Sequence, residues 1–259
     1  MARIPTSQLL AMLRSPDPHA RDELAYSELA QRIGAGEEDT NLERLGDSLE
    51  SLFSDAEIQA RSFAALALAD VVERDRLAPA LSPAAVRRWG QSFSAWYLGE
   101  DDLRGWDPKL GWLHAVAHGA DALGAFGRSR HLGQSDLVAL LALGGNRMLR
   151  PTDELFANQE EFRLAHGLAL VLTRPEVDVV QSTGWLLEIG ARLREGGPGP
   201  IPSWASNTLR TLSLIYVMAD RGVRLPDGDP GPPVTVMTEG PAVKEAVADA
   251  LSQAWPYLA

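Results

Sequence analysis

The stretch Phe63-Ala64-Ala65-Leu66-Ala67-Leu68 decides the fold class, because its apolar residues belong to a run with helical spacing and not to an alternating strand. Two later stretches resemble it: Trp112-Leu113-His114-Ala115-Val116-Ala117 and Phe162-Arg163-Leu164-Ala165-His166-Gly167. From residue 63 to 112 and from 112 to 162 the intervals are 49 and 50 residues, and Leu209 lies 47 residues further on. Such a period, with two helices in each repeat, predicts an α-solenoid of stacked antiparallel hairpins, similar to HEAT repeats. The alternative is a non-repetitive helical array, which could have helices of the same lengths.

Helical periodicity extends outward from these stretches through nearly the whole chain. Ser82-Pro83 and Asp107-Pro108 each predict a helix start, while Gly99, Gly127 and Gly196-Gly197 predict positions just past helix ends. The predicted helices span residues 6–14, 21–34, 41–53, 56–76, 83–98, 109–126, 134–149, 159–173, 176–195, 203–221 and 241–256.

The 259 residues are expected to form one all-α domain with a continuous core. Helical repeats would occupy about residues 20–222, followed by a connector rich in proline and glycine at about 223–240. Within the connector, residues 234–237 are expected to lie extended over the last repeat, which the helix at 241–256 would close as a cap.

The composition excludes several classes of function. A formal charge of −11 argues against nucleic acid and anionic membranes as partners, because their binding needs a basic surface. The absence of cysteine excludes disulfides, thiol catalysis and cysteine-ligated metals. No apolar run is long enough for a membrane span and no signal peptide is apparent, so a bacterial cytoplasm is the expected compartment. Nucleophile-elbow, Walker and dinucleotide motifs are absent as well.

Three polar residues point to a site. If a helix begins at Pro108, then His114, His118 and Asp121 share one stripe, because they stand at i, i+4 and i+7. Small residues would flank this stripe and larger apolar residues would cover the opposite face, as in a groove open to solvent. The small residues are Gly111, Ala115, Ala122 and Ala125, and the large ones are Leu110, Leu113, Val116 and Leu123.

Two imidazoles one turn apart can hold a divalent metal, with the carboxylate of Asp121 completing the site or orienting a histidine. The same set can place a general base beside its orienting acid. The alternative is that both histidines are structural and form hydrogen bonds to neighbouring helices. No His-Glu-x-x-His motif is present and the sequence offers no third obvious ligand, so both interpretations stay open.

A second cluster lies in the following repeat. Glu160 and Glu161 open a predicted helix, where the helix dipole already favours acids, while Arg163 and His166 share one side of it. In a stacked array these residues could reach the groove of His114, with Arg163 assisting catalysis and the others binding ligand. Trp106 and Trp112 could wall the same pocket, or they could be packing anchors.

At these residues the chain resembles the domain of unknown function 2785 family of bacterial proteins, over about residues 20–220. The resemblance implies an all-helical fold and a shared importance of His114, His118 and Asp121, but it implies no reaction. The stretches that carry it are Arg61-Ser62-Phe63-Ala64-Ala65-Leu66, Arg104-Gly105-Trp106, Gly111-Trp112-Leu113-His114-Ala115-Val116-Ala117-His118-Gly119-Ala120-Asp121 and Glu161-Phe162-Arg163-Leu164-Ala165.

Two hypotheses of function follow. In the first, the protein is an enzyme or a small-molecule binder whose groove contains His114, His118 and Asp121, and a divalent metal held there would activate water for hydrolysis. In the second, the chain is a helical-repeat interaction module that binds a protein or peptide, and its histidines are structural.

Overall fold

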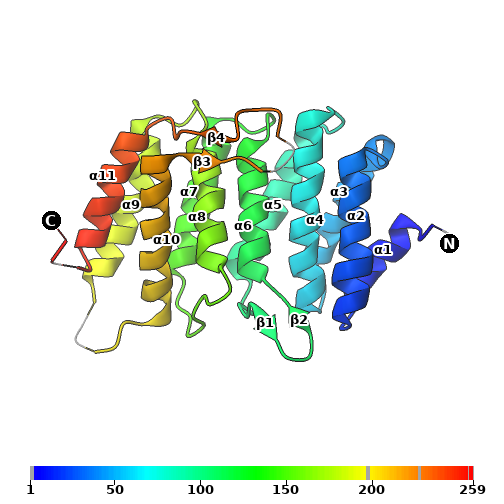
Figure 1. Ribbon diagram of the computed structural model, residues 1–259, viewed down its shortest axis with the longest axis horizontal. Coiled ribbons are helices and arrows are strands. Elements are labelled where there is room, and N and C mark those ends of the chain that lie inside the picture. Colours follow the sequence, from blue (N-terminus) through cyan, green and yellow to red (C-terminus); the bar gives the residue numbers. More distant parts are fainter. Residues whose placement is uncertain (1–2, 197–198, 227–228, 256, 259) are drawn as a thin grey trace. The chain divides into compact units, whose positions relative to one another are not determined.

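The computed structural model describes residues 3–196, 199–226, 229–255 and 257–258, and helices dominate it as the periodicity predicts (Figure 1). The chain divides into two compact units, residues 1–132 and 133–259, each of which is described by itself. In the described ranges, no helix combines the length and apolar character needed to cross a membrane. The predicted stop at Gly197 lies outside the described residues, and a single domain stays a prediction.

Among the described residues of the first unit, the regular elements are helices and one short hairpin of two strands. Its elements are α1 (Thr6–Met12), the π-helix η1 (His19–Tyr26), α2 (Ser27–Ala35), the 3-10 helix η2 (Asp39–Asn41), α3 (Leu42–Ser51), the 3-10 helix η3 (Leu52–Ser54), α4 (Ile58–Leu77), α5 (Pro83–Gly99), β1 (Trp106–Asp107), β2 (Gly111–Trp112) and α6 (Ala115–Arg128).

Helix α4 is central to the first unit and packs against α2, α3 and α6. Helices α4 and α6 run parallel. Near their starts Ser62 contacts His118, and near their ends Glu73 pairs with Arg128 at 3.0 Å. Helix α5 connects them and packs against both α3 and α6. This places the starts of α4 and α6 side by side, at the hairpin.

The second unit contains the remaining helices and a second short pair of strands. Within it α7 packs against α8 and α9, α8 packs against α10, and α11 covers both α9 and α10. Its elements are α7 (Gln134–Leu149), α8 (Glu160–Leu172), α9 (Val179–Arg194), α10 (Ser203–Arg221), β3 (Val223–Arg224), β4 (Val234–Thr235) and α11 (Gly240–Ser252).

In both units several helices pack against the next but one in sequence, α3 with α5 and α4 with α6, then α7 with α9 and α8 with α10. Stacked hairpins produce this pattern, but a continuous HEAT-like solenoid through both units stays a prediction. The expected extended segment of the connector pairs as β4 with β3, with Val223 opposite Thr235 and Arg224 opposite Val234.

Several predicted boundaries hold and others are wrong. Ser82 caps α5 by accepting a hydrogen bond from the amide of Ala85, and Pro83 is the first helical residue, as predicted. Gly127 lies inside α6 instead of past its end. The segment before Ala115 is not helical, so the predicted helix at 109–126 begins too early.

Candidate functional site

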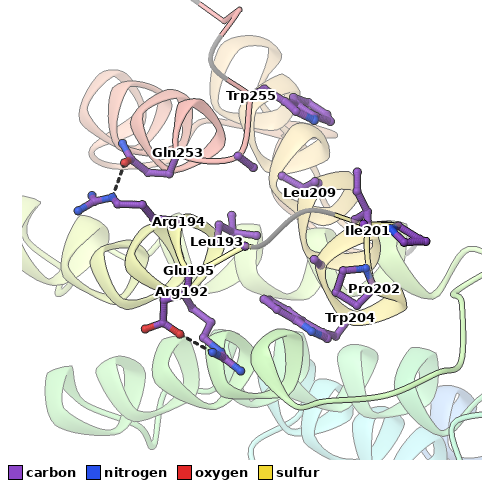
Figure 2. Close-up of a pocket in the computed structure, with 15 residues that line it drawn as sticks. Arg192, Leu193, Arg194, Glu195, Ile201, Pro202, Trp204, Leu209, Gln253 and Trp255 are labelled. Carbon is purple, nitrogen blue, oxygen red and sulfur yellow. Dashed lines mark hydrogen bonds and ion pairs between the residues drawn. The ribbon is translucent and has the colours of Figure 1, made fainter.

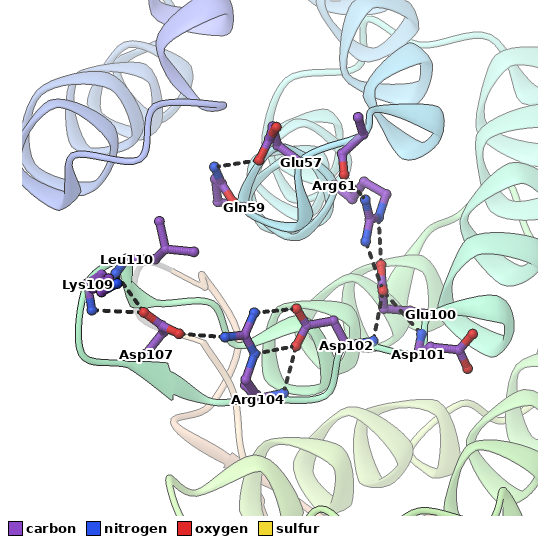
Figure 3. Close-up of polar contacts among 11 residues, drawn as sticks. Glu57, Gln59, Arg61, Glu100, Asp101, Asp102, Arg104, Asp107, Lys109 and Leu110 are labelled. Atoms are coloured by element: carbon purple, nitrogen blue, oxygen red, sulfur yellow. Dashed lines mark hydrogen bonds and ion pairs between the residues drawn. The ribbon is translucent and has the colours of Figure 1, made fainter.

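The β1–β2 hairpin replaces the first turns of the helix predicted from Pro108. The Asp107 side chain accepts hydrogen bonds from the amides of Lys109 at 2.8 Å and Leu110 at 3.0 Å (Figure 3). Asp107 thus closes a turn instead of capping a helix. Gly111 follows with φ +71°, and a Cβ there would lie 2.9 Å from Cγ of Pro18. The chain therefore turns back, and Trp106 pairs with Trp112 across the hairpin.

Two arginines hold the hairpin in place. Arg104 pairs with Asp102 and with Asp107, which joins the start of the loop to its turn (Figure 3). Hydrogen bonds from Arg104 keep the pKa of Asp102 below its ordinary value, and the backbone amides of Leu110 and Lys109 do the same for the pKa of Asp107.

Arg21 supports the hairpin from its inner side. This arginine is fully buried, and it donates hydrogen bonds to the carbonyls of Leu110 at 2.8 Å and Trp112 at 3.1 Å. Its guanidinium carbon lies 4.9 Å from the ring centroid of Phe63, and its Nε pairs with Asp22 at 2.6 Å. These contacts pair the buried guanidinium of Arg21 and attach it to the backbone of the hairpin.

His114 stands between the hairpin and α6 with left-handed backbone angles, φ +48° and ψ +34°. It precedes the first helical residue, so it cannot share a helical stripe with His118 and Asp121, and that prediction is wrong. The residue is half-buried, and its ring lies 4.4 Å from the Trp112 ring, centroid to centroid. Trp112 in turn meets Trp106 edge to face at 4.7 Å, and these two indoles are 42% and 50% exposed.

His118 is buried between helices and does not point into an open groove, contrary to the prediction. Its ring is edge-on to Phe63 at 4.8 Å, and its Nδ1 lies 2.9 Å from Oγ of Ser62. Ser62 donates its only hydroxyl proton to the carbonyl of Leu113, so its oxygen must accept from Nδ1–H of His118. In the neutral imidazole the lone pair is then on Nε2.

The histidines contact each other, with ring centroids 5.6 Å apart, and Asp121 lies half-buried one turn beyond His118 on α6. Across the described ranges no group of three or more His, Cys, Asp or Glu is arranged to hold a metal ion. Sequence reasoning missed Ser62 and Arg21 as supports of the site. Ser62 could have been noticed within the Arg61-Ser62-Phe63 stretch, but Arg21 gave no local signal.

Arg61 joins α4 to the end of α5 beside this site. It forms two hydrogen bonds with Glu100, at 2.7 and 2.9 Å, which Figure 3 shows beside the Arg104 cluster. Burial alone would raise the pKa of Glu100, but hydrogen bonds from Arg61, the amide of Asp102 and Trp96 keep this pKa below its ordinary value. These contacts anchor the start of the loop that carries the hairpin.

The second predicted cluster lies in the second unit. Glu160 is the first residue of α8 but is 1% exposed, so it is not a solvated helix start. Burial raises its pKa, although Oε2 accepts a hydrogen bond from the amide of Asn158 at 2.7 Å. Glu161 pairs with Arg210 at 2.8 Å. Glu160 is therefore a buried residue of the second unit.

Two further candidates lie along the same helix. His166 donates from Nε2 to the carbonyl of Arg224 at 2.7 Å, which ties α8 to β3, and Arg163 is half-buried one turn before it. Both residues belong to the second unit, whereas His114 belongs to the first. Their predicted participation in the His114 groove therefore stays a prediction.

The match to a family model comes from residues 51–217, which contain Ser62, both hairpin tryptophans and the two histidines. The model is described as a protein of unknown function, DUF2785. The chain belongs to this family. No curated protein and no solved structure matches the chain. The DUF2785 match begins at residue 51, so Arg21 lies before it, and it ends within α10, so α11 lies after it.

Proposed function

We propose that the protein binds a small molecule at the N-terminal end of α6, where the β1–β2 hairpin meets His114. The observation that carries this proposal is the left-handed His114 beside two exposed tryptophans in a braced hairpin. Non-glycine residues with such backbone angles are strained and cluster at binding and catalytic sites. Large aromatic side chains left exposed on a rigid support are typical of binding surfaces.

In this proposal each residue has a separate role. Trp106 and Trp112 contact the apolar part of the ligand, and the His114 imidazole contacts its polar part. His118 and Ser62 are positioning residues, because they are buried behind His114 and hold the start of α6. Proton transfer by His114 or His118, and a divalent metal held by them with Asp121, are extensions of the same proposal.

Thermal-shift screening of a metabolite library, followed by calorimetry on the hits, tests this function. The site variants are Trp112→Leu and His114→Gly, because glycine removes the imidazole and suits φ +48°. The matched control is Trp185→Leu, a half-buried tryptophan of α9 in the other unit. We expect compounds that stabilise the wild type and the control but neither site variant. A screen in which every hit binds both site variants as tightly as the wild type would contradict the proposal.

The metal extension is tested with Zn²⁺ or Mn²⁺ alone, titrated calorimetrically into protein purified without a histidine tag. Binding that is lost in Asp121→Asn and in His114→Gly supports it. Stoichiometric binding that survives both substitutions would place the metal elsewhere on the chain.

A helical-repeat interaction module is the second candidate. It is supported by the burial of His118 and by the packing of alternate helices within each unit. In that case the exposed tryptophans would contact a protein or peptide partner. Cross-linking of the full chain in cells separates the two functions, since loss of one specific protein adduct in Trp112→Leu would favour the interaction module.

A further inference from the structure

A pocket of about 550 Å³ opens in the second unit, where α9 ends and α10 begins (Figure 2). This volume lies in the range of small-molecule sites. Trp204 of α10 and Trp255, which follows α11, are among its lining residues, and the buried Leu193 and Leu209 contribute apolar surface between them. The pocket thus offers two indole rings and an apolar interior to a ligand.

Arg192 places a positive charge against one of these indoles. Its guanidinium carbon lies 5.4 Å from the centroid of the Trp204 ring. It also pairs with Glu195, the first residue after α9, but the two side chains are 45% and 63% exposed. An ion pair this exposed contributes little, so Arg192 can exchange Glu195 for another anion at small cost.

Arg194 supplies a second positive charge at a separate edge of the pocket (Figure 2). Its Nε donates a hydrogen bond to Oε1 of Gln253 at 2.8 Å, so the residue that follows α11 orients the guanidinium. Arg194 forms no ion pair with the described residues, as distinct from most arginines of this acidic chain. The charged residues that line the pocket are two arginines and one glutamate. The lining is therefore positively charged, although the chain has a net charge of −11.

We propose that this pocket binds a small organic anion with an aromatic or bulky apolar body. The body would lie among Trp204, Trp255 and Leu209, and the anionic group would pair with Arg192 or Arg194 at the edge. Arginine suits this role because its planar fork binds carboxylates and sulfonates through paired hydrogen bonds. The site is separate from the one proposed at His114, which belongs to the other unit.

The experiment uses the full chain and two probes of equal shape, naphthalene-1-carboxylate and the neutral naphthalene-1-methanol. Binding is measured by calorimetry and by quenching of tryptophan fluorescence. We expect one molecule of the carboxylate to bind per chain, at least about tenfold more tightly than the alcohol, which corresponds to about 1.4 kcal/mol. Equal affinity for the two probes, or no binding of the carboxylate at millimolar concentration, would overturn the proposal.

The double variant Arg192→Met, Arg194→Met tests the location. Its matched control is Arg221→Met, Arg224→Met, which removes the same charge from exposed positions of the same unit. We expect at least about a tenfold loss of carboxylate affinity in the pocket variant and less than about a twofold change in the control. Trp204→Leu should weaken both probes alike. An equal loss in both double variants would show non-specific attraction and refute this site.

Discussion

His114 and His118 are four positions apart, yet their environments differ because the backbone changes course between them. His114 ends the hairpin with a positive φ and is half-buried, whereas His118 lies inside the α4–α6 contact. His118, which is buried between two helices, therefore supports the site. A residue with a strained backbone and partial exposure is the better candidate to contact a ligand.

Replacing His118 with alanine should destabilise the protein. The substitution removes the donor that Oγ of Ser62 accepts from and leaves a cavity against Phe63. We expect the free energy of unfolding to fall by about 1–3 kcal/mol, measured by urea denaturation. His19→Ala is the matched control, because His19 is exposed and pairs only with the exposed Glu23. An unchanged stability of His118→Ala would show that its buried contacts contribute nothing.

Asp70 should make the stability depend on pH. Burial raises its pKa to about 7, although a hydrogen bond from Tyr26 opposes the shift, and its Oδ2 has no hydrogen-bond partner among the described residues. Between the ordinary value of 3.8 and about 7, the folded state keeps a proton that the unfolded chain releases. The contribution of Asp70 to the free energy of unfolding is therefore greatest below this window and falls as the pH rises through it.

Asp70→Asn tests this sign, because the amide is neutral at every pH. We expect the wild type to lose roughly 1–3 kcal/mol relative to the variant between pH 5 and pH 8, in urea unfolding at both values. Asp39→Asn is the control. A hydrogen bond from Arg74 lowers the pKa of Asp39, so that change should reduce stability at pH 8. Parallel pH profiles for wild type and Asp70→Asn would refute the protonated carboxyl.

At the scale of elements, the α5–α6 contact depends on a residue without a side chain. A Cβ on Gly119 would lie 2.2 Å from the Tyr97 ring. That ring is buried, stacks on Phe93 at 5.4 Å and donates a hydrogen bond to the carbonyl of Val116 at 3.0 Å. The ring is therefore held in place and α6 would have to move away, which would disturb the start of the helix that carries the site.

We expect Gly119→Ala to reduce the free energy of unfolding by about 1–3 kcal/mol, despite the higher helix propensity of alanine. Gly34→Ala in α2 is the matched control, since nothing lies within 4 Å of a Cβ there. The control should gain about 0.5–1 kcal/mol from propensity alone. An equal increase in stability of both variants, measured by thermal unfolding, would mean that the Tyr97 ring can move aside to make room for the added methyl group.

For the whole molecule, the charge of −11 predicts the absence of useful affinity for nucleic acid at physiological salt. Fluorescence anisotropy with labelled single-stranded and duplex oligonucleotides checks this. We expect no binding below about 1 μM protein, because an acidic chain repels phosphates instead of releasing their counterions. A submicromolar, salt-sensitive dissociation constant would contradict this prediction, because it would require a basic surface patch on this acidic chain.

The sequence by itself determined the helical class and most helix positions. Periodic apolar residues and local caps such as Ser82-Pro83 act over a few residues, so they can be recognised without knowledge of the fold. The helices at 134–149 and 203–221 have the predicted bounds for the same reason. The sequence also placed His114, His118 and both hairpin tryptophans in one segment of the chain.

Only the tertiary structure decided what those residues do. Asp107-Pro108 is compatible with a helix start, but the Asp107 side chain closes a turn, and Arg21 holds the resulting hairpin from 89 residues away. The burial of His118 likewise depends on Ser62, which is 56 residues distant. A local pattern contains no information about such partners, so the helical stripe and open groove that it favoured give way to one buried and one strained histidine.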